Sequence, residues 1–504
     1  MELSTFSLFT LGLTEVVKAK VLVSLFLGSL AGIVAGCIPG FTIAMAVILT
    51  LPFTFGMSPV QGLATMIGVY VGGLSGGLIS ACLIGIPGTP SAIATTFDGH
   101  PMAKKGEAGR ALALGVWASF WGGLLSTLAL MALAPPLSYL ALAFGPWEYF
   151  SLILFAMTII ASLSGESLLK GLISGLFGLL VATVGSDPIS NVPRFTFGMH
   201  EMEGGLDFLP ILIGLFAFSN LMEELEAKRA SATALIDIKT VRVPHLKSNL
   251  EILFRQPWNL IRSSLVGMFV GTLPGAGSSI SNIVSYDRAK KASASPEQFG
   301  TGIPDGVIAS EAGNSSTAGG ALIPMIALGI PGDAITAVML GALIIHGIQP
   351  GPLLITNHPN LVYGMFVAFF FAHFATAGIQ SAVGLRFFLR LTSTPKYILV
   401  PVILVLCAVG AFALNNRIFD IWVLFVFGIL GYGMSKLEIP LAPLILGVIL
   451  GPILETNLRR ALMTDPNIFL FVTRPYSLVL LVLALGSLLY PVWRSRQAIP
   501  HRQA

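Results

Sequence analysis

The sequence carries the stretch Gly32-Ile-Val-Ala-Gly36-Cys-Ile-Pro39-Gly40, which returns far along the chain as Gly267-Met-Phe-Val-Gly271-Thr-Leu-Pro274-Gly275. Every glycine and proline of the first stretch has a counterpart in the second. Another pair, Gly85-Ile-Pro-Gly88 and Gly329-Ile-Pro-Gly332, follows in the same order. Proline removes a backbone donor and glycine accepts unusual torsions, so each motif should interrupt a helix. We therefore predict two related halves that carry the same pair of helix breaks.

The composition places the chain in a lipid bilayer. Of its 504 residues, 10% are charged and 55% are hydrophobic, whereas an ordinary globular protein has roughly 25% charged residues. So few charges could not cover the surface of a soluble fold of this length. The net charge of +4 is too small to indicate nucleic-acid binding. The three cysteines lie far apart in apolar stretches, which excludes a disulfide framework or a zinc-binding spacing.

The apolar segments predict an all-α polytopic membrane protein. A spanning helix needs about 20 mostly apolar residues, and we expect about ten to fourteen membrane elements, some broken or re-entrant. The expected elements are 21–38, 62–86, 111–134, 149–163, 168–185, 207–222, 258–281, 307–330, 334–349, 361–390, 397–414, 419–434, 440–453 and 475–493.

The longest polar stretch divides the chain almost in half. It runs from about Glu223 to Asn259 and mixes basic and acidic residues. We therefore expect a first membrane repeat over 1–222 and a connecting polar loop over 223–259. A second repeat with C-terminal helices follows over 260–493, and a basic tail over 494–504.

The repeated breaks indicate a transport site rather than simple kinks. In hydrocarbon, unpaired backbone groups are tolerated only inside protein or beside a wet cavity. Interrupted segments at matching positions in two halves are the sequence sign of a transporter's binding site. Helix N-termini at such breaks offer free N–H groups and a positive dipole end to an anion, while freed carbonyls suit a cation. The four-residue glycine spacings Gly28/Gly32/Gly36 and Gly68/Gly72/Gly76 predict close helix packing.

Polar residues gather beside these breaks. Thr89, Ser91, Thr95, Thr96 and Asp98 follow the second break, and Ser278, Ser279, Ser281 and Asn282 follow the third. The run from Glu311 through Asn314, Ser315, Ser316 and Thr317 precedes the fourth break, which Asp333 follows. As alternatives, Asn314–Thr317 could form a helix cap or a loop, and Asp333 could be a helix cap. Asp305 and Glu311 could equally be loop residues. We expect His346 and His373 to be core histidines with their hydrogen bonds satisfied.

Sequence motifs of enzymes are missing. The chain has no phosphate loop of the Gly-x-x-x-x-Gly-Lys-Ser/Thr type and no Gly-x-Ser-x-Gly elbow, and His200-Glu201 lacks the second histidine of a zinc protease. We therefore predict that the chain is not an enzyme, and that an ion gradient drives its transport.

At these residues the sequence resembles the large membrane subunit of the tripartite tricarboxylate transporter family. The supporting stretches are Ile86-Pro-Gly-Thr-Pro-Ser-Ala-Ile-Ala-Thr-Thr-Phe-Asp98-Gly99, Leu273-Pro-Gly-Ala-Gly277, Phe299-Gly-x-Gly302-x-x-Asp-Gly-Val307 and Gly320-Ala-Leu-Ile-Pro324-x-x-x-Leu-Gly-Ile-Pro-Gly332. The likeness extends from about Gly32 to Leu354. The family usually has Gly-Gly-Ser, an Asn before the first-half Pro-Gly, and an Asn-Asn pair. Here these places hold Gly76-Gly77-Leu78, Gly85 and Asn314-Ser315, which bears on the substrate more than on the fold.

The resemblance implies a permease subunit of a secondary transporter in the bacterial inner membrane. Its implied partners are a small membrane subunit of about four spans and a periplasmic solute-binding protein. The implied cargo is citrate or another carboxylate, taken up with a sodium ion or a proton, and no other cofactor is expected. An ion channel, a self-sufficient organic-anion carrier and a membrane-embedded enzyme remain as alternatives.

We expect the two halves to have inverted topology, with the breaks meeting near the membrane midplane. One bundle would move against the other to give alternating access, and an elevator-like displacement is one form of this motion. The cation is expected at Asp333, Asp305 and Thr317. The carboxylate substrate is expected at Pro39, Gly40, Gly88, Thr89, Ser91, Gly275, Ser278, Ser279, Asn314, Ser315, Ser316 and Gly332.

Overall fold

The computed structural model describes residues 5–163, 167–187, 189–226, 246–380, 388 and 396–498. Almost all of the described secondary structure is helical. A small antiparallel pair of strands, β1 (Gly185–Ser186) and β2 (Pro193–Arg194), sets Gly185 opposite Arg194. The prediction of an all-α polytopic membrane protein is confirmed. Parts of the predicted loop 223–259, of the predicted span 361–390 and of the tail 494–504 lie outside the described residues.

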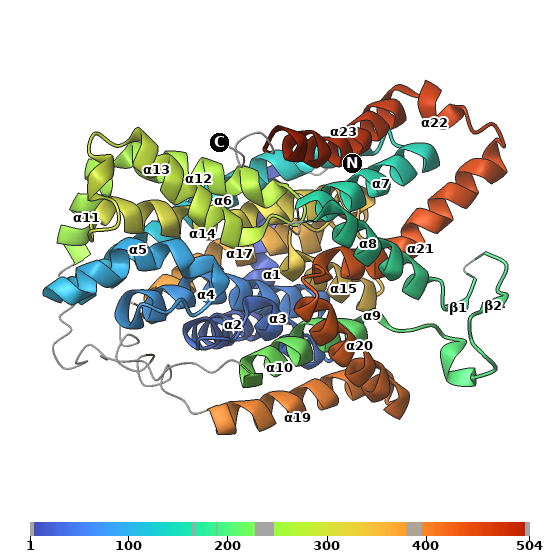
Figure 1. The fold of residues 1–504 in the computed structure, drawn as a ribbon, viewed down its shortest axis with the longest axis horizontal. Coiled ribbons are helices and arrows are strands. Elements are labelled where there is room, and N and C mark those ends of the chain that lie inside the picture. Colours follow the sequence, from blue (N-terminus) through green and yellow to red (C-terminus); the bar gives the residue numbers. More distant parts are fainter. Residues whose placement is uncertain are drawn as a thin grey trace. The chain divides into compact units, whose positions relative to one another are not determined.

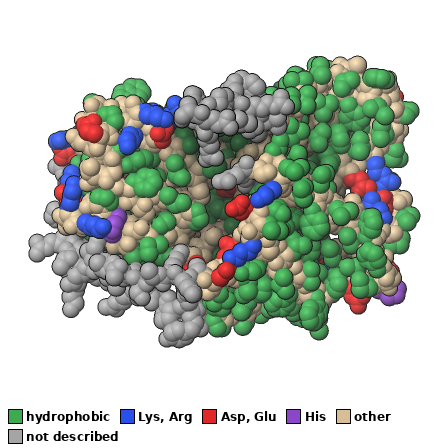
Figure 2. All heavy atoms as spheres, in the orientation of Figure 1, with side chains coloured by type: hydrophobic (Ala, Val, Ile, Leu, Met, Phe, Trp, Pro, Cys, Tyr) green, Lys and Arg blue, Asp and Glu red, His purple; other side chains and the backbone are tan. Residues whose placement is uncertain are grey.

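The described residues contain eight helical segments that are long and apolar enough to cross a membrane, together with six shorter apolar helices. Figure 2 shows hydrophobic side chains spread over one face, with charged side chains gathered in a few clusters. Large apolar side chains such as Leu176, Val405 and Ile429 are more than half exposed. Lipid is the solvent that suits such a surface.

The chain forms two compact units, which cut across the order of the sequence. Unit 1 comprises Met1–Ser138 and Asn220–Gly410, and unit 2 comprises Tyr139–Ser219 and Ala411–Ala504. This is a division in space, whereas the predicted halves are a division in sequence. The related halves and their boundaries therefore stay a prediction.

Unit 1 holds all four Pro-Gly breaks. Its helices, shown in Figure 1, include α6, which runs on into unit 2, and α19, which does the same. They are α1 (Thr5–Val16), α2 (Ala19–Cys37), α3 (Ile43–Thr50), η1 (Leu51–Thr54), α4 (Pro59–Ile84), η2 (Pro90–Ala92), α5 (Ile93–Met102), η3 (Ala103–Glu107), α6 (Ala108–Ala141), α10 (Ser219–Glu226), α11 (Leu246–Arg255), α12 (Pro257–Thr272), α13 (Gly277–Ala292), η7 (Pro296–Gln298), α14 (Pro304–Leu328), α15 (Ala334–Ile345), α16 (Leu353–Asn357), α17 (Pro359–Ile379) and α19 (Lys396–Asn415).

The predicted interruptions fall where the motifs lie. Helix α2 ends at Cys37 just before Pro39-Gly40, and α12 ends at Thr272 just before Pro274-Gly275. Helices α4 and α14 both end on a left-handed glycine, Gly85 and Gly329, a conformation that glycine adopts without steric penalty. Each break therefore separates two helices, and the expected single element 258–281 is in fact α12 followed by α13.

Glycine stripes set the closest helix pairs of unit 1. Helix α2 lies along α4 and α12 lies along α14. A Cβ atom built on Gly32 would overlap the carbonyl oxygen of Val69, and one on Gly271 would overlap that of Thr317. The predicted close packing is thus confirmed, because no larger residue would fit at this backbone separation.

Unit 2 is a smaller helical bundle. Helix α21 packs on α7 and α8, α23 packs on α7, and α20 packs on η5. Its elements are α7 (Pro146–Leu163), α8 (Leu168–Ala182), β1, β2, η4 (His200–Met202), α9 (Phe208–Leu212), η5 (Ile213–Phe218), α20 (Ile418–Lys436), α21 (Leu441–Thr464), α22 (Leu470–Thr473) and α23 (Pro475–Ala498).

Candidate functional site

The densest buried polar cluster of unit 1 lies where η2 and α5 meet α13 and α14. These elements are separated by some two hundred positions in the chain, yet they are in direct contact. Asn282 on α13 is the link. Its Oδ1 accepts a hydrogen bond from the backbone N–H of Ala94 (2.6 Å), and its Nδ2 donates to the carbonyl of Ser310 (3.0 Å). The first N–H groups of a helix have no acceptor within the helix. Asn282, from another part of the chain, provides an acceptor for one of these N–H groups in α5.

Glu311 lies at the centre of this cluster and is fully buried. Its carboxylate accepts hydrogen bonds from the hydroxyls of Thr95 on α5 (2.6 Å) and Ser119 on α6 (2.9 Å). Among the described residues, no lysine, arginine or histidine lies within ion-pair distance of it. An isolated charge in such surroundings is costly, so Glu311 needs a neutralising cation or proton.

A small cavity adjoins the Glu311 cluster, with room for about one water molecule. Ser119 and Ser315 line it, and their hydroxyls are 2.8 Å apart. His373 and Thr376 on α17 also line it. The Nε2 of His373 and the Oγ1 of Thr376 are buried without a hydrogen-bond partner. The expectation of satisfied histidines is therefore wrong, because α17 places the His373 ring against this cavity, Phe369 and Gly123. The buried Nε2 of His346 also has no partner among the described residues.

Asp98 on α5 holds the loop that leads into α14. Its carboxylate accepts hydrogen bonds from the backbone N–H groups of Gly300 (3.0 Å), Gly302 (2.7 Å) and Ile303 (3.1 Å), and from the hydroxyl of Tyr286 (2.8 Å). All four donors are neutral but converge on one carboxylate, as around a bound anion. Asp98 thus fixes the loop Phe299–Ile303, part of the motif that carries the family resemblance.

The breaks themselves lie against one another in pairs. The N–H of Gly275 donates to the carbonyl of Gly332 (3.0 Å). A Cβ on Gly332 would contact the carbonyl oxygen of Gly271, and one on Gly88 would overlap that of Gly36. Gly36 and Gly271 occupy the same place in the two copies of the opening motif, so the same close approach occurs in both.

The expected substrate residues fall into two neighbouring groups. The hydroxyls of the buried Thr89 and Ser91 are 2.8 Å apart at the start of η2. Ser278 and Ser279 form the first turn of α13, which packs on η2. Pro39 and Gly40, with a φ of +90° at Gly40, lie in the break between α2 and α3.

The polar run of α14 is helical throughout. Every residue from Gly306 to Ala327 is buried, so Asn314–Thr317 form neither a cap nor a loop and Glu311 lies in a helix. Asn314 Nδ2 donates to the carbonyl of Leu74 (3.0 Å), but its Oδ1 has no partner. Ser316 and Thr317 bond the carbonyl of Gly313 within the helix.

The expected cation residues do not come together. Asp333 caps α15 through Thr336 and also accepts a hydrogen bond from Tyr70 (2.5 Å). Asp305 lies in the first turn of α14 and accepts a hydrogen bond from Gln256 (2.8 Å). Helix α14 lies between these two carboxylates in sequence, and a helix of its length measures about 37 Å. Asp333, Asp305 and Thr317 therefore do not form one cation site in this structure, and their role stays a prediction.

Sequence reasoning did not select Glu311, Thr95, Ser119 or Asn282 as site residues. One signal was present for α14. Ser310, Glu311, Asn314 and Ser315 recur at helical spacing and would share one face of a helix. Ser119 sits alone in an apolar run, so only the packing of α6 on α14 reveals it.

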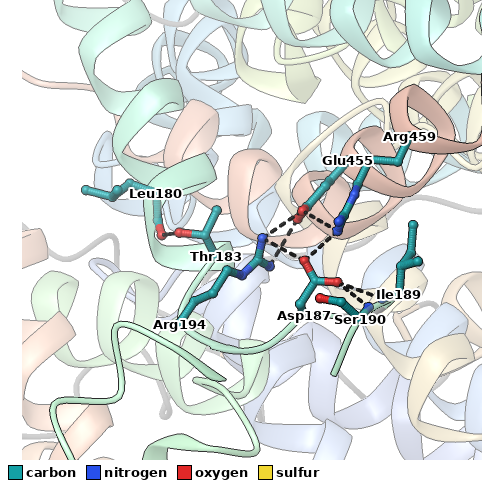
Figure 3. Close-up of polar contacts among 8 residues, drawn as sticks. All are labelled: Leu180, Thr183, Asp187, Ile189, Ser190, Arg194, Glu455 and Arg459. Carbon is teal, nitrogen blue, oxygen red and sulfur yellow. Dashed lines mark hydrogen bonds and ion pairs between the residues drawn. The ribbon is translucent and has the colours of Figure 1, made fainter. Parts of the chain in front are cut away.

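A second cluster of charged groups lies in unit 2 (Figure 3). Arg194 on β2 makes two hydrogen bonds to Glu455 on α21 (2.7 and 3.2 Å) and lies 3.3 Å from Asp187. Arg459, one turn beyond Glu455, also donates to Asp187. The pKa of Asp187 lies below its usual range, chiefly because the backbone N–H of Ser190 donates to its carboxylate, with further help from the N–H of Ile189 and from Arg459.

Buried carboxylates at helix ends of unit 2 are paired with arginine in the same way. Arg474 donates to Glu148 (2.5 Å) and its guanidinium lies over the Trp147 ring. Arg417 bonds Asp420 (2.9 Å) and Asp207 (2.6 Å). These groups form a network of compensated charges, which is the pattern of structural support.

Helices interrupted at paired glycine-proline breaks, around buried hydroxyl, amide and carboxyl groups, define a polytopic membrane transporter. Residues 22–446 match the tripartite tricarboxylate transporter TctA family, and the chain belongs to that family. It is thus a membrane component of a transporter and not an enzyme.

Two relatives from Agrobacterium vitis are similar to the chain. An uncharacterised 52.8 kDa protein in the TAR-I ttuC' 3' region is 36% identical over 97% of this chain and 96% of its own length. An uncharacterised protein in the TAR-II ttuC' 3' region is 35% identical over 44% of this chain and 90% of its own length. No solved structure matches the chain.

Proposed function

We propose that the chain is the permease subunit of a binding-protein-dependent secondary transporter in the bacterial inner membrane. It imports tricarboxylates such as citrate, or related carboxylates, and a sodium or proton gradient drives the uptake. It works with a small membrane subunit and with a periplasmic solute-binding protein that delivers the substrate. Membership of the family supports this proposal, and the geometry at the start of α13 supports an anionic substrate.

The observation that carries the proposal is the uncapped N-terminus of α13. At the other breaks, Thr42 caps α3, Asp333 caps α15, and Asn282 bonds the first turn of α5. At α13 the N-cap residue is Ala276, which makes no side-chain cap, and the helix begins with Gly277 and Ser278. A Cβ on Gly277 would meet nothing within 4 Å, so open space adjoins free N–H groups at the positive end of a helix dipole.

A carboxylate of the substrate would bind there, with the hydroxyls of Ser278 and Ser279 as further donors. Thr89 and Ser91, on the η2 element that packs on α13, would bind another part of the same molecule. Two such groups, one from each predicted half, suit a di- or tricarboxylate better than a single small anion. Asn314, Ser315 and Ser316, on the neighbouring helix α14, would then contribute further hydrogen bonds to the bound substrate.

The complex is tested by gentle detergent purification from the native host, followed by mass identification of the copurifying proteins. We expect a small membrane subunit in stoichiometric amount. The purified complex, reconstituted in vesicles with the solute-binding protein, should accumulate labelled citrate or a related carboxylate. Conductance without substrate would favour a channel, and uptake by the chain alone would favour a self-sufficient carrier. Either result would contradict the proposal.

The substrate site is tested with the double variant Ser278→Ala, Ser279→Ala. Each lost hydrogen bond to a charged carboxylate is worth about 1.5 kcal/mol or more, so we expect the KM for uptake to rise roughly tenfold or more. The matched control is Thr301→Ala, which removes an exposed hydroxyl beyond the opposite end of α13. An unchanged KM in the double variant, at normal membrane levels, would remove α13 from the site.

A further inference from the structure

Glu311 differs from the other buried carboxylates of the protein in its partners. Asp98 accepts three backbone N–H hydrogen bonds, and Glu148 and Asp420 each lie against an arginine. Glu311 accepts hydrogen bonds from the hydroxyls of Thr95 and Ser119, the Asn314 amide is a further neutral partner, and no arginine or lysine of the described residues lies within ion-pair distance. A hydroxyl both donates and accepts, so these two hydroxyls can serve the ionised carboxylate and the neutral carboxyl group alike.

The hydroxyls around Glu311 have alternative acceptors. Thr95 Oγ1 lies 2.6 Å from Glu311 Oε1 and 3.1 Å from Ser310 Oγ, but it has one proton to donate. When Glu311 is neutralised, Thr95 can turn to Ser310 and accept from the carboxyl group. Ser119 donates to Glu311 and accepts a hydrogen bond from Ser315. At Thr95 the network therefore accommodates a change of charge at Glu311 without leaving the donor unpaired.

The adjoining cavity supplies a place for an ion or water to approach. Ser119 and Ser315 belong both to the Glu311 network and to the cavity wall. Thr376 Oγ1, which also belongs to a lining residue of the cavity, is buried without a hydrogen-bond partner among the described residues and could serve as an oxygen ligand. Hydroxyl oxygens of Ser119, Ser315 and Thr376 thus line a space of about one water molecule, and the Ser119 hydroxyl connects this space to Glu311.

Other titratable groups around α14 leave the carboxylate without a counter-charge. Cys82 on α4 is buried, and a thiol provides no positive charge. His373 on α17 lines the cavity. Asp98 on α5 and Tyr286 on α13 bond each other (2.8 Å), and Arg262 on α12 bonds Asn259 (3.1 Å).

We propose that Glu311 is the carboxyl group that takes up and releases the coupling cation, a proton or a sodium ion, during transport. This rests on the proposed function and gives its coupling step a residue. An ionised Glu311 without a positively charged partner opposes any motion that keeps it buried between α5, α6 and α14, because the charge is uncompensated. Uptake of the cation removes this barrier, so the transporter moves when Glu311 is neutralised.

The test uses the complex with its small membrane subunit and binding protein, reconstituted in vesicles at zero membrane potential. A tenfold inward gradient of sodium or of protons is imposed in separate arms. For one cation per substrate, either gradient can sustain at most about tenfold accumulation of the carboxylate. The gradient that drives the wild type identifies the cation.

Glu311→Gln preserves the shape of the side chain and its hydrogen bonds but is permanently neutral. We expect this variant to lose gradient-driven accumulation, with a final ratio of about one, while it still exchanges internal for external carboxylate. The matched control is Glu107→Gln, an exposed glutamate of unit 1 paired with Arg110, which should accumulate as the wild type does. Normal accumulation by Glu311→Gln would overturn the proposal and leave the proposed function intact. A wild type that responds to neither gradient would overturn both.

A second variant is needed if Glu311→Gln also loses the exchange of internal for external carboxylate. Ser119→Ala removes one donor from the ionised carboxylate and leaves Glu311 in place. A hydrogen bond to a charged group is lost, so we expect the cation concentration for half-maximal uptake to shift roughly tenfold, towards tighter binding for a proton. The KM for the carboxylate should change far less. An unchanged cation dependence would overturn the proposal.

Discussion

The two units treat buried carboxylates in opposite ways. In unit 2, Asp187, Glu148 and Asp420 each lie against an arginine. In unit 1, Glu311 is as fully buried as Asp420, yet its hydrogen-bond partners are neutral and no arginine or lysine of the described residues pairs with it. A compensated charge holds elements in place, whereas an uncompensated charge in a membrane protein marks a site that exchanges ions. The difference therefore separates structural from functional carboxylates better than burial alone.

The largest effect should come from breaking a compensated pair of unit 2. Arg474→Met leaves Glu148 buried without its partner, and we expect a loss of about 2–3 kcal/mol of stability, because part of the arginine is exposed and the full penalty does not apply. Thermal unfolding of the purified complex measures this loss. Glu311→Gln should leave the unfolding temperature unchanged or raised, because it removes an uncompensated charge. Equal losses in both variants would abolish the contrast between the units.

A smaller loss of stability is expected at Asp98, the buried carboxylate of unit 1 that is bonded by backbone N–H groups and a tyrosine hydroxyl and not by an arginine. Asp98→Asn keeps one acceptor oxygen but points an amide NH2 at a backbone N–H or at Tyr286. We expect a loss of about 1–3 kcal/mol, since donors are left unsatisfied. Hydrogen exchange should rise in the loop Phe299–Ile303 while exchange at β1 and β2 stays constant. Protection unchanged in that loop would show that Asp98 does not hold it.

The smallest effect concerns the acid dependence of the Asp187 cluster. The pKa of Asp187 is lowered in the folded protein, chiefly by the N–H of Ser190. The stabilisation that the ionised Asp187 gives to the folded state is therefore fully present above its unfolded pKa of about 3.9, and it is lost only as the pH falls through the lower, folded pKa. Hydrogen exchange at the amides of Ile189 and Ser190, corrected for intrinsic rates, should therefore show constant protection between about pH 8 and pH 5. Loosening within that window would contradict the ionised, arginine-paired state. If protons drive transport, uptake should vary with pH in this same window.

Much of the fold followed from local sequence. The apolar segments predicted the helices, and Gly85 and Gly329 predicted where α4 and α14 end, because backbone torsions depend on the residue that adopts them. Thr89, Ser91, Ser278 and Ser279 were selected because they follow such breaks. For Glu311 the sequence is also compatible with a loop, since the glycine and serine residues around it weaken any helical signal.

The sequence by itself determined that the chain is a helical membrane protein with breaks at Pro39, Pro87, Pro274 and Pro331, because composition and torsional preference act within a few residues. Only the tertiary structure decided which polar groups meet. The hydroxyl partners of Glu311 come from α5 and α6, and the arginine Arg459 beside Asp187 comes from α21, each far away in sequence. A buried charge is defined by what surrounds it in space, and no local pattern carries that information.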